Sequence, residues 1–167
     1  MQVEKVMTRG VQTCSPEDSA NRAAQIMWEH DCGIVPIVDH QGRVVAVVTD
    51  RDICMAAYTQ GKQLTEIPVS IAASQRVISV QPNDSLETAE ARMCEHQVRR
   101  IPVVDNDGRL CGMLATADLA RRIQPADRGG DGVKPVDVAQ TVAAVSQPHG
   151  SPQPQYQGSS QPQHRAA

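Results

Sequence analysis

The sequence predicts an α/β (α+β) protein made of two similar subdomains, and three observations carry this prediction. The first is an internal repeat, because residues 33–39 and the chain after them recur without a gap at 99–105. The second is that short β-rich runs alternate with helical patterns inside each copy. The third is the composition, which is 40% hydrophobic but only 2% aromatic, so the core must be aliphatic. We therefore expect two β-α-β-β-α units packed as a pair.

The two copies also agree upstream of that segment. The residues shared there are Pro16, Asp18, Ser19, Ala23, Met27, Glu29 and His30 in the first copy and Pro82, Asp84, Ser85, Ala89, Met93, Glu95 and His96 in the second. Such a unit is longer than a solenoid repeat, and two copies are too few for a solenoid.

In the first copy, cap-type side chains, a proline and early acids mark the start of a helix, and apolar residues at helical spacing continue it. The continuous apolar runs that follow are typical of strands covered on both faces. The expected elements are a strand at 11–14, a helix from 15–19 to about His30, strands at 34–38 and 43–49, and a helix from Asp50 to about Tyr58 with Gly61 as its stop.

The second copy repeats this order. Its first helix begins at 84–87, which resembles a capping box with the acid three residues after the cap. The expected elements are a strand at 77–80, a helix from 84–87 to about His96, strands at 98–104 and 110–114, and a helix from Thr116 to about Ile123.

The remaining segments differ in composition. Beyond Gln124 the chain is first Gly- and Asp-rich, then carries Val138, Val142 and Val145 near one helical face, and from Ser146 is Gln, Pro, Ser and Gly with almost nothing to bury. The expected boundaries are 3–61 for repeat one, 62–75 for a connector, 69–123 for repeat two, 124–145 for a flexible segment able to hold a short helix, and 146–167 for a disordered tail.

Composition narrows the function classes. A net charge of −3 and a pI of about 5.9 give no general attraction to nucleic acid or to anionic membranes, and few aromatic residues are present for base stacking. No apolar run is long enough to span a bilayer, and the first residues lack the apolar core of a signal peptide. We therefore expect a cytoplasmic protein.

Five cysteines occur at wide spacing without a Cys-x-x-Cys pair, which argues against a disulfide framework and a structural zinc site. We expect mostly small buried thiols, with Cys14 as the candidate for a redox-sensing thiol because a strand runs into a loop there. His30 and His96 recur near helix ends, where a structural role is favoured over metal binding. Trp28 is expected in packing or in a dimer contact.

The doubled apolar-Pro-apolar-apolar-Asp segments and the run from Val47 to Ile53 resemble the CBS domain, and two copies in tandem resemble a CBS pair, or Bateman module. The resemblance covers roughly residues 3–123. The chain is similar to stand-alone bacterial CBS-pair proteins of the hypoxic-response type, whose second repeat carries a segment like 95–103.

The resemblance implies two repeats packed about a pseudo-two-fold axis, with two clefts that bind AMP, ADP, ATP or S-adenosylmethionine. It also implies a homodimer and a regulatory role toward another protein, with no obligatory cofactor and no catalysis. In this pattern the aspartate holds ribose hydroxyls, a hydroxyl lies near ribose and phosphate, and each cleft borrows the first strand of the opposite repeat. The first cleft would contain Thr49, Arg51, Asp52, Gly33, Ile34 and Val35, with Ile78 and Ser79 borrowed from repeat two.

The second cleft would contain Asp118, Thr116, Arg100, Ile101 and Pro102, with Gln12 and Thr13 borrowed from repeat one. It departs from the pattern at Ala115, where a hydroxyl is expected, and the first cleft has Ile34 in place of the arginine. Neither cleft is complete, so we expect their affinities to differ.

The chemistry of these residues fits a nucleotide, because a carboxylate accepts from two vicinal hydroxyls, a helix N-terminus presents free N–H groups to an anion, and arginine pairs with phosphate. The alternative is that Asp52 and Asp118 are early helix acids favoured by the dipole and that the arginines form a solvated face. The clefts would then be vestigial in an interaction protein.

An enzyme is disfavoured because no Ser-His-Asp order, metal cluster or phosphate-cradling loop is present, and a DNA-binding regulator because of the acidic pI.

Overall fold

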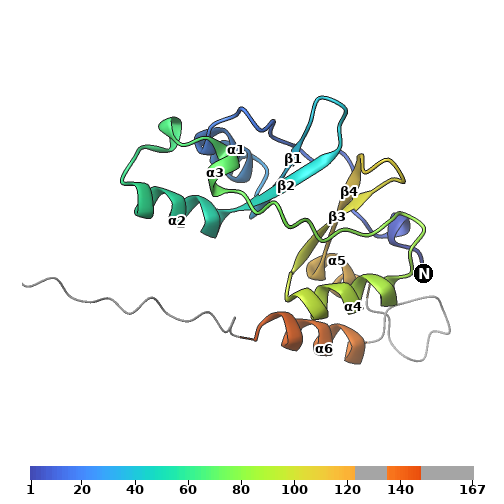
Figure 1. Ribbon diagram of the computed structural model, residues 1–167. Helices are drawn as coiled ribbons and strands as arrows, with labels where there is room; N and C mark the ends of the chain where they lie inside the picture. The colour runs from blue at the N-terminus through green and yellow to red at the C-terminus, as the bar shows by residue number, and fades with distance from the viewer. Residues whose placement is uncertain (123–134, 148–167) are drawn as a thin grey trace, which may run out of the picture.

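The computed structural model describes residues 1–122 and 135–147. It confirms the α/β fold, in which each repeat is an antiparallel β-hairpin flanked by helices (Figure 1). The first repeat contains α1 (Ala20–Glu29), β1 (Ile34–Val38), β2 (Val44–Thr49) and α2 (Asp50–Gln60); the second contains α4 (Leu86–His96), β3 (Arg100–Val104), β4 (Leu110–Ala115) and α5 (Thr116–Ala120).

Four further helical segments lie outside this scheme, and the expected connector holds two of them. They are η1 (Val3–Lys5), η2 (Leu64–Glu66), α3 (Val69–Ala72) and α6 (Pro135–Val145). Helix α2 ends as expected, because Gly61 adopts φ +62° and its N–H reaches the carbonyl of Ala57. Helix α5 is shorter than the expected run to about Ile123, because it ends at Ala120 with Arg121 as its C-cap. Of the tail expected at 146–167, residues 148–167 lie outside the described residues.

The strands expected at 11–14 and 77–80 are each reduced to a single parallel bridge. Cys14 N–H donates to the carbonyl of Pro36 at 3.0 Å and its carbonyl accepts from Val38 N–H at 2.9 Å; Val80 bridges Val103 in the same way. The next ladder bond would need an N–H from residue 16 or 82, and both are prolines. The prediction of strands there was wrong for this reason.

The expected capping box at 84–87 is also wrong in register. Ser85 is the N-cap of α4, and its hydroxyl accepts from Thr88 N–H at 3.1 Å. The Asp84 carboxylate instead accepts from Gln81 N–H at 2.8 Å and closes the preceding turn. A short polar side chain can stabilise a turn or cap a helix equally well. Of the two adjacent candidates, Asp84 stabilises the turn and Ser85 caps the helix.

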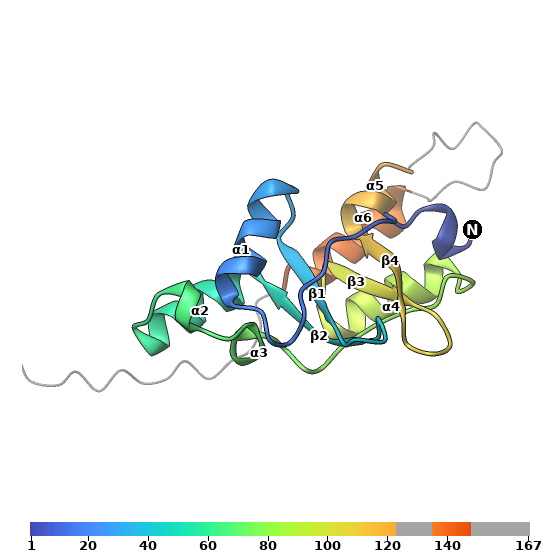
Figure 2. The same ribbon diagram turned by 90° about the horizontal axis from the view of Figure 1, so that it is seen from above.

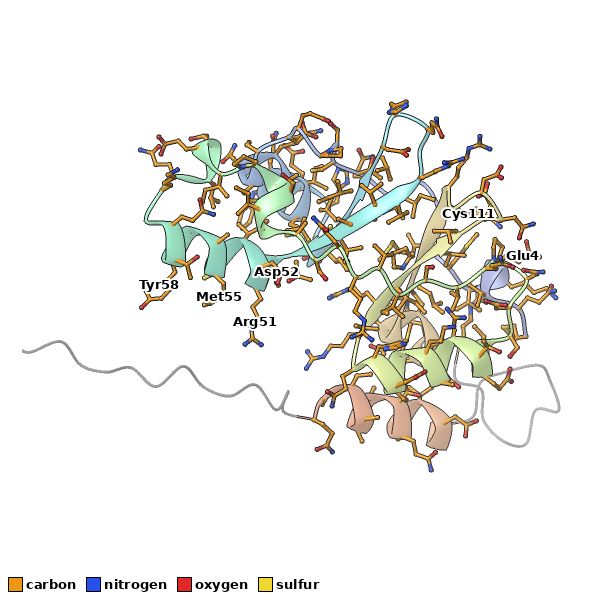
Figure 3. All side chains as sticks on the ribbon, in the orientation of Figure 1. Glu4, Arg51, Asp52, Met55, Tyr58 and Cys111 are labelled. Carbon is orange, nitrogen blue, oxygen red and sulfur yellow. The ribbon has the colours of Figure 1, made fainter. Side chains whose placement is uncertain are left out.

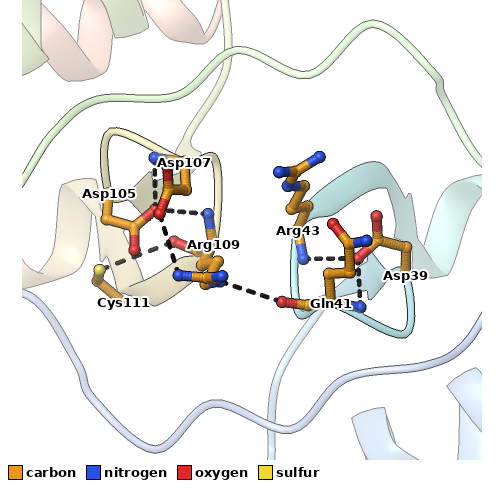
Figure 4. Close-up of polar contacts among 7 residues, drawn as sticks. All are labelled: Asp39, Gln41, Arg43, Asp105, Asp107, Arg109 and Cys111. Atoms are coloured by element: carbon orange, nitrogen blue, oxygen red, sulfur yellow. Dashed lines mark hydrogen bonds and ion pairs between the residues drawn. The ribbon is translucent and has the colours of Figure 1, made fainter.

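The two hairpins meet at their turns. Val44 N–H donates to the carbonyl of Gly108, and Leu110 N–H donates to that of Gly42, both at 3.0 Å. The two hydrogen bonds are equivalent, because interchanging the repeats turns the Val44–Gly108 pair into the Leu110–Gly42 pair. This equivalence defines a pseudo-two-fold axis between the turns. Figure 4 shows the side-chain contacts there, including Arg109 Nε donating to the carbonyl of Gln41 at 3.3 Å.

The aspartates of the two repeated motifs stabilise these turns. Asp39 Oδ1 accepts from the backbone N–H groups of Gln41 and Arg43 at 2.8 and 2.9 Å. Asp105 Oδ1 accepts from those of Asp107 and Arg109 at 2.9 and 2.8 Å (Figure 4). The motif aspartate is thus a turn residue in both copies.

The segments that precede the two repeats cross over. Thr8 pairs with Met113 of the second repeat through bonds of 2.8 and 2.9 Å, and Ser74 pairs with Val47 of the first through bonds of 2.8 and 3.1 Å. Figure 2 shows the N-terminal segment lying along the second repeat. Residues 1–8 therefore cover repeat two, and residues 67–74 cover repeat one in the equivalent way.

The core is divided between the repeats and is aliphatic, as expected. One cluster lies in repeat one, and the other contains residues from repeat two, the N-terminal segment and α6. Helix α6 forms where a short helix was expected, but Val142 is 44% exposed, while Val138, Thr141 and Val145 are buried. Positions 138, 141 and 145 follow the i, i+3, i+7 spacing of one face, whereas 142 lies beside it.

Candidate functional site

In the first repeat, Thr49 and Asp52 form a capping box at the start of α2. Asp52 N–H donates to Thr49 Oγ1 at 3.2 Å, while Asp52 Oδ2 accepts from the Thr49 N–H at 2.9 Å and from its hydroxyl at 2.7 Å. Both bonds to the Asp52 carboxylate use Oδ2, and Oδ1 accepts no hydrogen bond from any residue that the structure describes. One carboxylate oxygen of the half-buried Asp52 is therefore available at the start of α2.

In the second repeat, the equivalent carboxylate is fully engaged. Asp118 Oδ2 accepts from Ala115 N–H at 2.8 Å, and Oδ1 forms an ion pair with the guanidinium of Arg121. Alanine has no oxygen to return the cap bond, and Thr116 uses its N–H to donate to the Arg99 carbonyl at 3.0 Å. Asp118 is 7% exposed and Arg121 is largely exposed. From the sequence, Arg121 was considered only as one of the arginines of a solvated face, although its position three residues after Asp118 is the usual spacing for a helical ion pair.

Arg100 lies beside the residues of the first cleft. A Cβ placed on Gly33 would lie 3.2 Å from Asp50 Oδ2 and 3.5 Å from Arg100 Nη1, so glycine leaves room for both side chains. Arg100 begins β3 of repeat two, yet its guanidinium reaches repeat one. The resemblance assigned Arg100 to the second cleft, and the structure brings it to Gly33 of the first.

Arg51 extends from the first turn of α2 into open space, and Asp52 lies beside it on the same turn (Figure 3). The Arg51 side chain is exposed. With Arg100, it gives the start of α2 two guanidinium groups that can approach an anion.

The apolar residues expected beside a base are mostly in the core. Val35 and Ile101 have no exposed surface, Pro102 is buried, and Ile34 is half-buried. The backbone at Val35 and Ile101 can face a ligand, but their side chains cannot do so without leaving the core.

The residues expected to be borrowed across the repeats differ in their surroundings. Ile78 packs against the core of repeat two, and the Ser79 carbonyl accepts from Arg92 Nη1 at 2.7 Å. Gln12 is exposed and Thr13 is half-buried.

The described residues form a polar and an apolar hollow. One, of about 310 Å³, is polar, and Ser79 is the one predicted site residue on its wall. The other, of about 510 Å³, is apolar and lies between α1 and α2. Asp52 and Asp118, the residues expected to bind ribose, therefore line neither hollow. The polar hollow is lined by Ser79, Val80, Gln81, Asp84, Arg92 and Val104.

The cysteines contradict the expectation that most are buried. Cys14 is buried, Cys54 is exposed, and the other three are intermediate. Burial raises the pKa of the Cys14 thiol to about 11, which disfavours the reactive thiolate form and the redox role considered for it. Cysteines are small enough to sit on helix surfaces, and the exposed Cys54 of α2 lines the hollow between α1 and α2.

The described residues place no three His, Cys, Asp or Glu side chains where they could share a metal ion. Within the same residues, no helix is both long and apolar enough to cross a membrane. His30 is the C-cap of α1 and His96 is the last residue of α4, so both lie at helix ends as expected.

The CBS domain model matches residues 3–58 and 67–125, which are the two repeats. The chain is 41% identical over 118 residues to the CBS domain-containing protein YhcV of Bacillus subtilis, covering 71% of this chain and 82% of that protein. It is 34% identical to hypoxic response protein 1 of Mycobacterium tuberculosis, with the same coverage. More distant matches include archaeal homoserine O-acetyltransferases, of which the chain spans 24%.

Solved structures agree in fold. Hypoxic response protein I with two coordinated zinc ions superposes with a TM-score of 0.68 at 32% identity, covering 74% of this chain and all of that one. CBSX2 in complex with AMP gives 0.64 at 26% identity, covering 72% and 93%. The CBS pair of MJ0100 in complex with 5′-methylthioadenosine and S-adenosylmethionine also gives 0.64 at 26% identity, covering 72% and 94%.

Proposed function

Because the chain belongs to the CBS domain family, we propose that it is a non-enzymatic regulatory module that binds an adenosine-containing nucleotide of the AMP, ADP or ATP class. Two relatives of the same fold hold AMP or S-adenosylmethionine. S-adenosylmethionine shares the adenosine group and is a further candidate ligand. The module would transmit ligand binding to another protein.

The free oxygen of Asp52 is the observation that carries this proposal. Asp52 Oδ2 is held by the capping box, so Oδ1 is fixed in position and can accept from a ribose hydroxyl. The N-terminus of the 11-residue α2 presents backbone N–H groups to phosphate. Arg51 and Arg100 add positive charge at the same end of the helix, and the Gly33 backbone lies beside Arg100.

We propose that the second cleft is the weaker one. A ribose hydroxyl at Asp118 has to compete with Arg121 for Oδ1, and Ala115 supplies no hydroxyl. Thr116, Ile101, Pro102, Gln12 and Thr13 remain proposed contacts of this cleft.

We also propose that the module functions as a cytoplasmic homodimer. All five cysteines are free, which is the usual state in a reducing compartment. Exposed apolar side chains on the helices of repeat one supply a surface for self-association.

Calorimetry with AMP, ADP, ATP and S-adenosylmethionine tests the nucleotide proposal. We expect Asp52→Ala to weaken the tighter binding event about tenfold or more, because a charged hydrogen bond contributes roughly 1.5–3 kcal/mol. Asp118→Ala is the matched control and should leave that event unchanged. Arg100→Ala should weaken phosphate-bearing ligands and leave adenosine unaffected. Binding that ignores Asp52→Ala would show that the ligand lies elsewhere.

A second candidate is an interaction protein with vestigial clefts. The ion pair of Asp118 with Arg121 and the alanine at 115 favour it for the second repeat. If the wild type binds none of the four ligands, this candidate replaces the first.

A further inference from the structure

The two carboxylates at the proposed ribose positions differ in the residue that follows three places later in the chain. In repeat two that residue is Arg121, and its guanidinium forms an ion pair with Asp118 Oδ1. The alignment of the repeats places Met55 at the equivalent position of repeat one. Methionine carries no charge, and Asp52 Oδ1 accepts no hydrogen bond from any residue that the structure describes. The side chain at this position therefore decides whether Oδ1 is open to a ligand.

The two carboxylates are oriented in the same way. In each repeat Oδ2 accepts from the backbone N–H of the residue three positions earlier, at 2.9 Å for Asp52 and 2.8 Å for Asp118. Figure 3 shows Met55 on α2 one turn after Asp52. Arg121 thus contacts the oxygen that corresponds to the free oxygen of Asp52, which is the one proposed to accept from a ribose hydroxyl.

The two members of the Asp118–Arg121 ion pair differ strongly in burial. The Asp118 side chain is 8% exposed, whereas that of Arg121 is 70% exposed. A nearly buried acceptor that loses its donor is costly, so Asp118 Oδ1 needs a replacement before Arg121 can leave. The guanidinium is at the surface and can turn toward an anion without disturbing the core. The pair can therefore exchange partners only when two replacements arrive together.

The other positive groups of the first cleft have no direct counterpart in the second. Ala117 stands at the position of Arg51, and the Arg100 guanidinium lies beside Gly33 of the first cleft. Helix α5 has only five residues, compared with 11 in α2. Arg99 is exposed, and its carbonyl is hydrogen-bonded to the first residue of α5, so a second cationic residue lies at this helix start. A phosphate in the second cleft would depend on such arginines.

We propose that Arg121 makes the second cleft selective for adenosine ligands that carry a phosphate. A phosphate monoester carries roughly 1.5–2 negative charges near neutral pH and attracts the guanidinium away from the carboxylate of Asp118. A ribose hydroxyl then donates to the released Oδ1, so the buried carboxylate keeps a donor. Adenosine supplies the hydroxyl but no phosphate, and Arg121 stays on Asp118.

This inference rests on the proposed nucleotide binding and adds a difference in ligand class between the two clefts. Met55 leaves Asp52 open, so the first cleft accepts adenosine with or without a phosphate. The second cleft responds only when the phosphate is present. The two clefts of one chain would therefore report different features of the same ligand.

Isothermal titration calorimetry with adenosine and AMP tests the role of Arg121, because these ligands differ only in the phosphate. The full chain with Asp52→Ala removes the first carboxylate and isolates the second cleft. In this background adenosine should bind about tenfold more weakly than AMP. Adding Arg121→Met should strengthen adenosine binding about fivefold and weaken AMP binding. Opposite changes for the two ligands are the signature, because a merely structural defect would weaken both.

Arg122→Met, in the same Asp52→Ala background, is the matched control. It removes the same charge at the next position, but Arg122 Nη2 donates to the carbonyl of Lys5 at 3.2 Å, and no contact with Asp118 is present among the described residues. Adenosine binding should stay unchanged in this variant.

The reciprocal change tests the same rule in repeat one. Met55→Arg, combined with Asp118→Ala to silence the second cleft, gives Asp52 the neighbour that Asp118 has. Adenosine binding should weaken about fivefold, and AMP binding should weaken less. This arm does not depend on the folding of the Asp52→Ala variant, and circular dichroism checks every variant.

The outcomes separate this inference from the proposed function. If AMP and adenosine bind but Arg121→Met changes neither ligand or weakens both, the selective role of Arg121 is refuted and nucleotide binding stands. An Asp52→Ala chain that binds AMP no better than adenosine also refutes it. If neither ligand binds the unaltered chain or the chain with Arg121→Met, the proposed function fails, and this inference fails with it.

Discussion

A carboxylate in the first turn of a helix can be held with one oxygen or with both, and this chain shows both cases. Asp52 uses Oδ2 in the capping box with Thr49, and its Oδ1 stays available. Asp118 spends one on Ala115 N–H and the other on Arg121. Chemically equal side chains at equivalent positions therefore differ in what they can offer to a ligand.

Burial of Cys14 gives a prediction at the same scale. Its pKa of about 11 leaves roughly 0.1% thiolate at a pH near 8, and the thiolate is the form that alkylates. Iodoacetamide should therefore modify the exposed Cys54 first and Cys14 last, as read by peptide mass spectrometry. Denaturant should remove the difference. Early modification of Cys14 in the folded protein would contradict its burial.

The sequence predicted the residues around Asp52 better than those around Asp118. The positions of Thr49 and Asp52, three residues apart before a helix, indicate the helix start that the structure shows. The ion pair of Asp118 depends on the rotamer of an exposed arginine, which a residue pattern does not specify. The reach of Arg100 to Gly33 depends on how the repeats pack, which also lies beyond local patterns.

At the scale of elements, the packing of α6 on α4 carries an electrostatic cost. Glu90 Oε1 on α4 is buried and has no hydrogen-bond partner among the described residues. Burial raises the pKa of Glu90, and the nearby charges of Asp137 on α6 and Glu87 on α4 raise it further. The folded protein therefore holds this proton more tightly than the unfolded chain does.

The raised pKa of Glu90 predicts how the stability of the fold depends on pH. The raised pKa stabilises the fold below the ordinary value of 4.5, and that contribution is lost as pH rises through the higher folded value. Glu90→Gln should therefore raise the melting temperature at pH near 7, by roughly 1–3 °C, and have little effect near pH 4. Differential scanning calorimetry at both pH values is the measurement.

Glu87→Gln is the matched control, because the pKa of Glu87 is lowered by hydrogen bonds from its own backbone N–H and from Ser85. Its charged form is favoured in the folded state, so removing the charge should give no gain at neutral pH. Equal gains in both variants would indicate a general effect of net charge rather than the buried contact.

At the scale of the whole molecule, the segments that precede the two repeats hold the pair together by crossing. Val3 N–H donates to the Asp84 carbonyl at 3.0 Å, and Val69 N–H donates to that of Asp18 at 2.8 Å. Both valine side chains are fully buried, Val3 in the core of repeat two and Val69 in that of repeat one. Each repeat is thus completed by residues that belong to the other in sequence.

This crossing predicts that two equivalent substitutions act on different repeats. Val3→Ala should speed hydrogen exchange in α4, and Val69→Ala should speed it in α1, each with a stability loss of about 2 kcal/mol from the deleted methyl groups and the cavity. Hydrogen exchange followed by mass spectrometry resolves the two helices. If Val3→Ala instead loosened α1, the first segment would not belong to repeat two.

The repeat itself was evident in the sequence, and with it the pairing of two similar units. The crossing was not predicted, although the same offset relates Val3 to Val69 and Thr8 to Ser74. These segments are short and share few identical residues, so they read as a lead-in and a connector. The two segments resemble each other in how their backbones pair with the opposite repeat. That pairing depends on the repeat they contact rather than on their own side chains.

The crossing also bears on the order of synthesis. The apolar residues Val3, Val6 and Met7 leave the ribosome well before Leu114 and Leu119, with which they share a core. At usual elongation rates they wait on the order of ten seconds for those residues. Residues 9–74, by contrast, contain their own partners and can close while translation continues. The nascent chain therefore completes the core of repeat two after that of repeat one, using a segment made before either repeat.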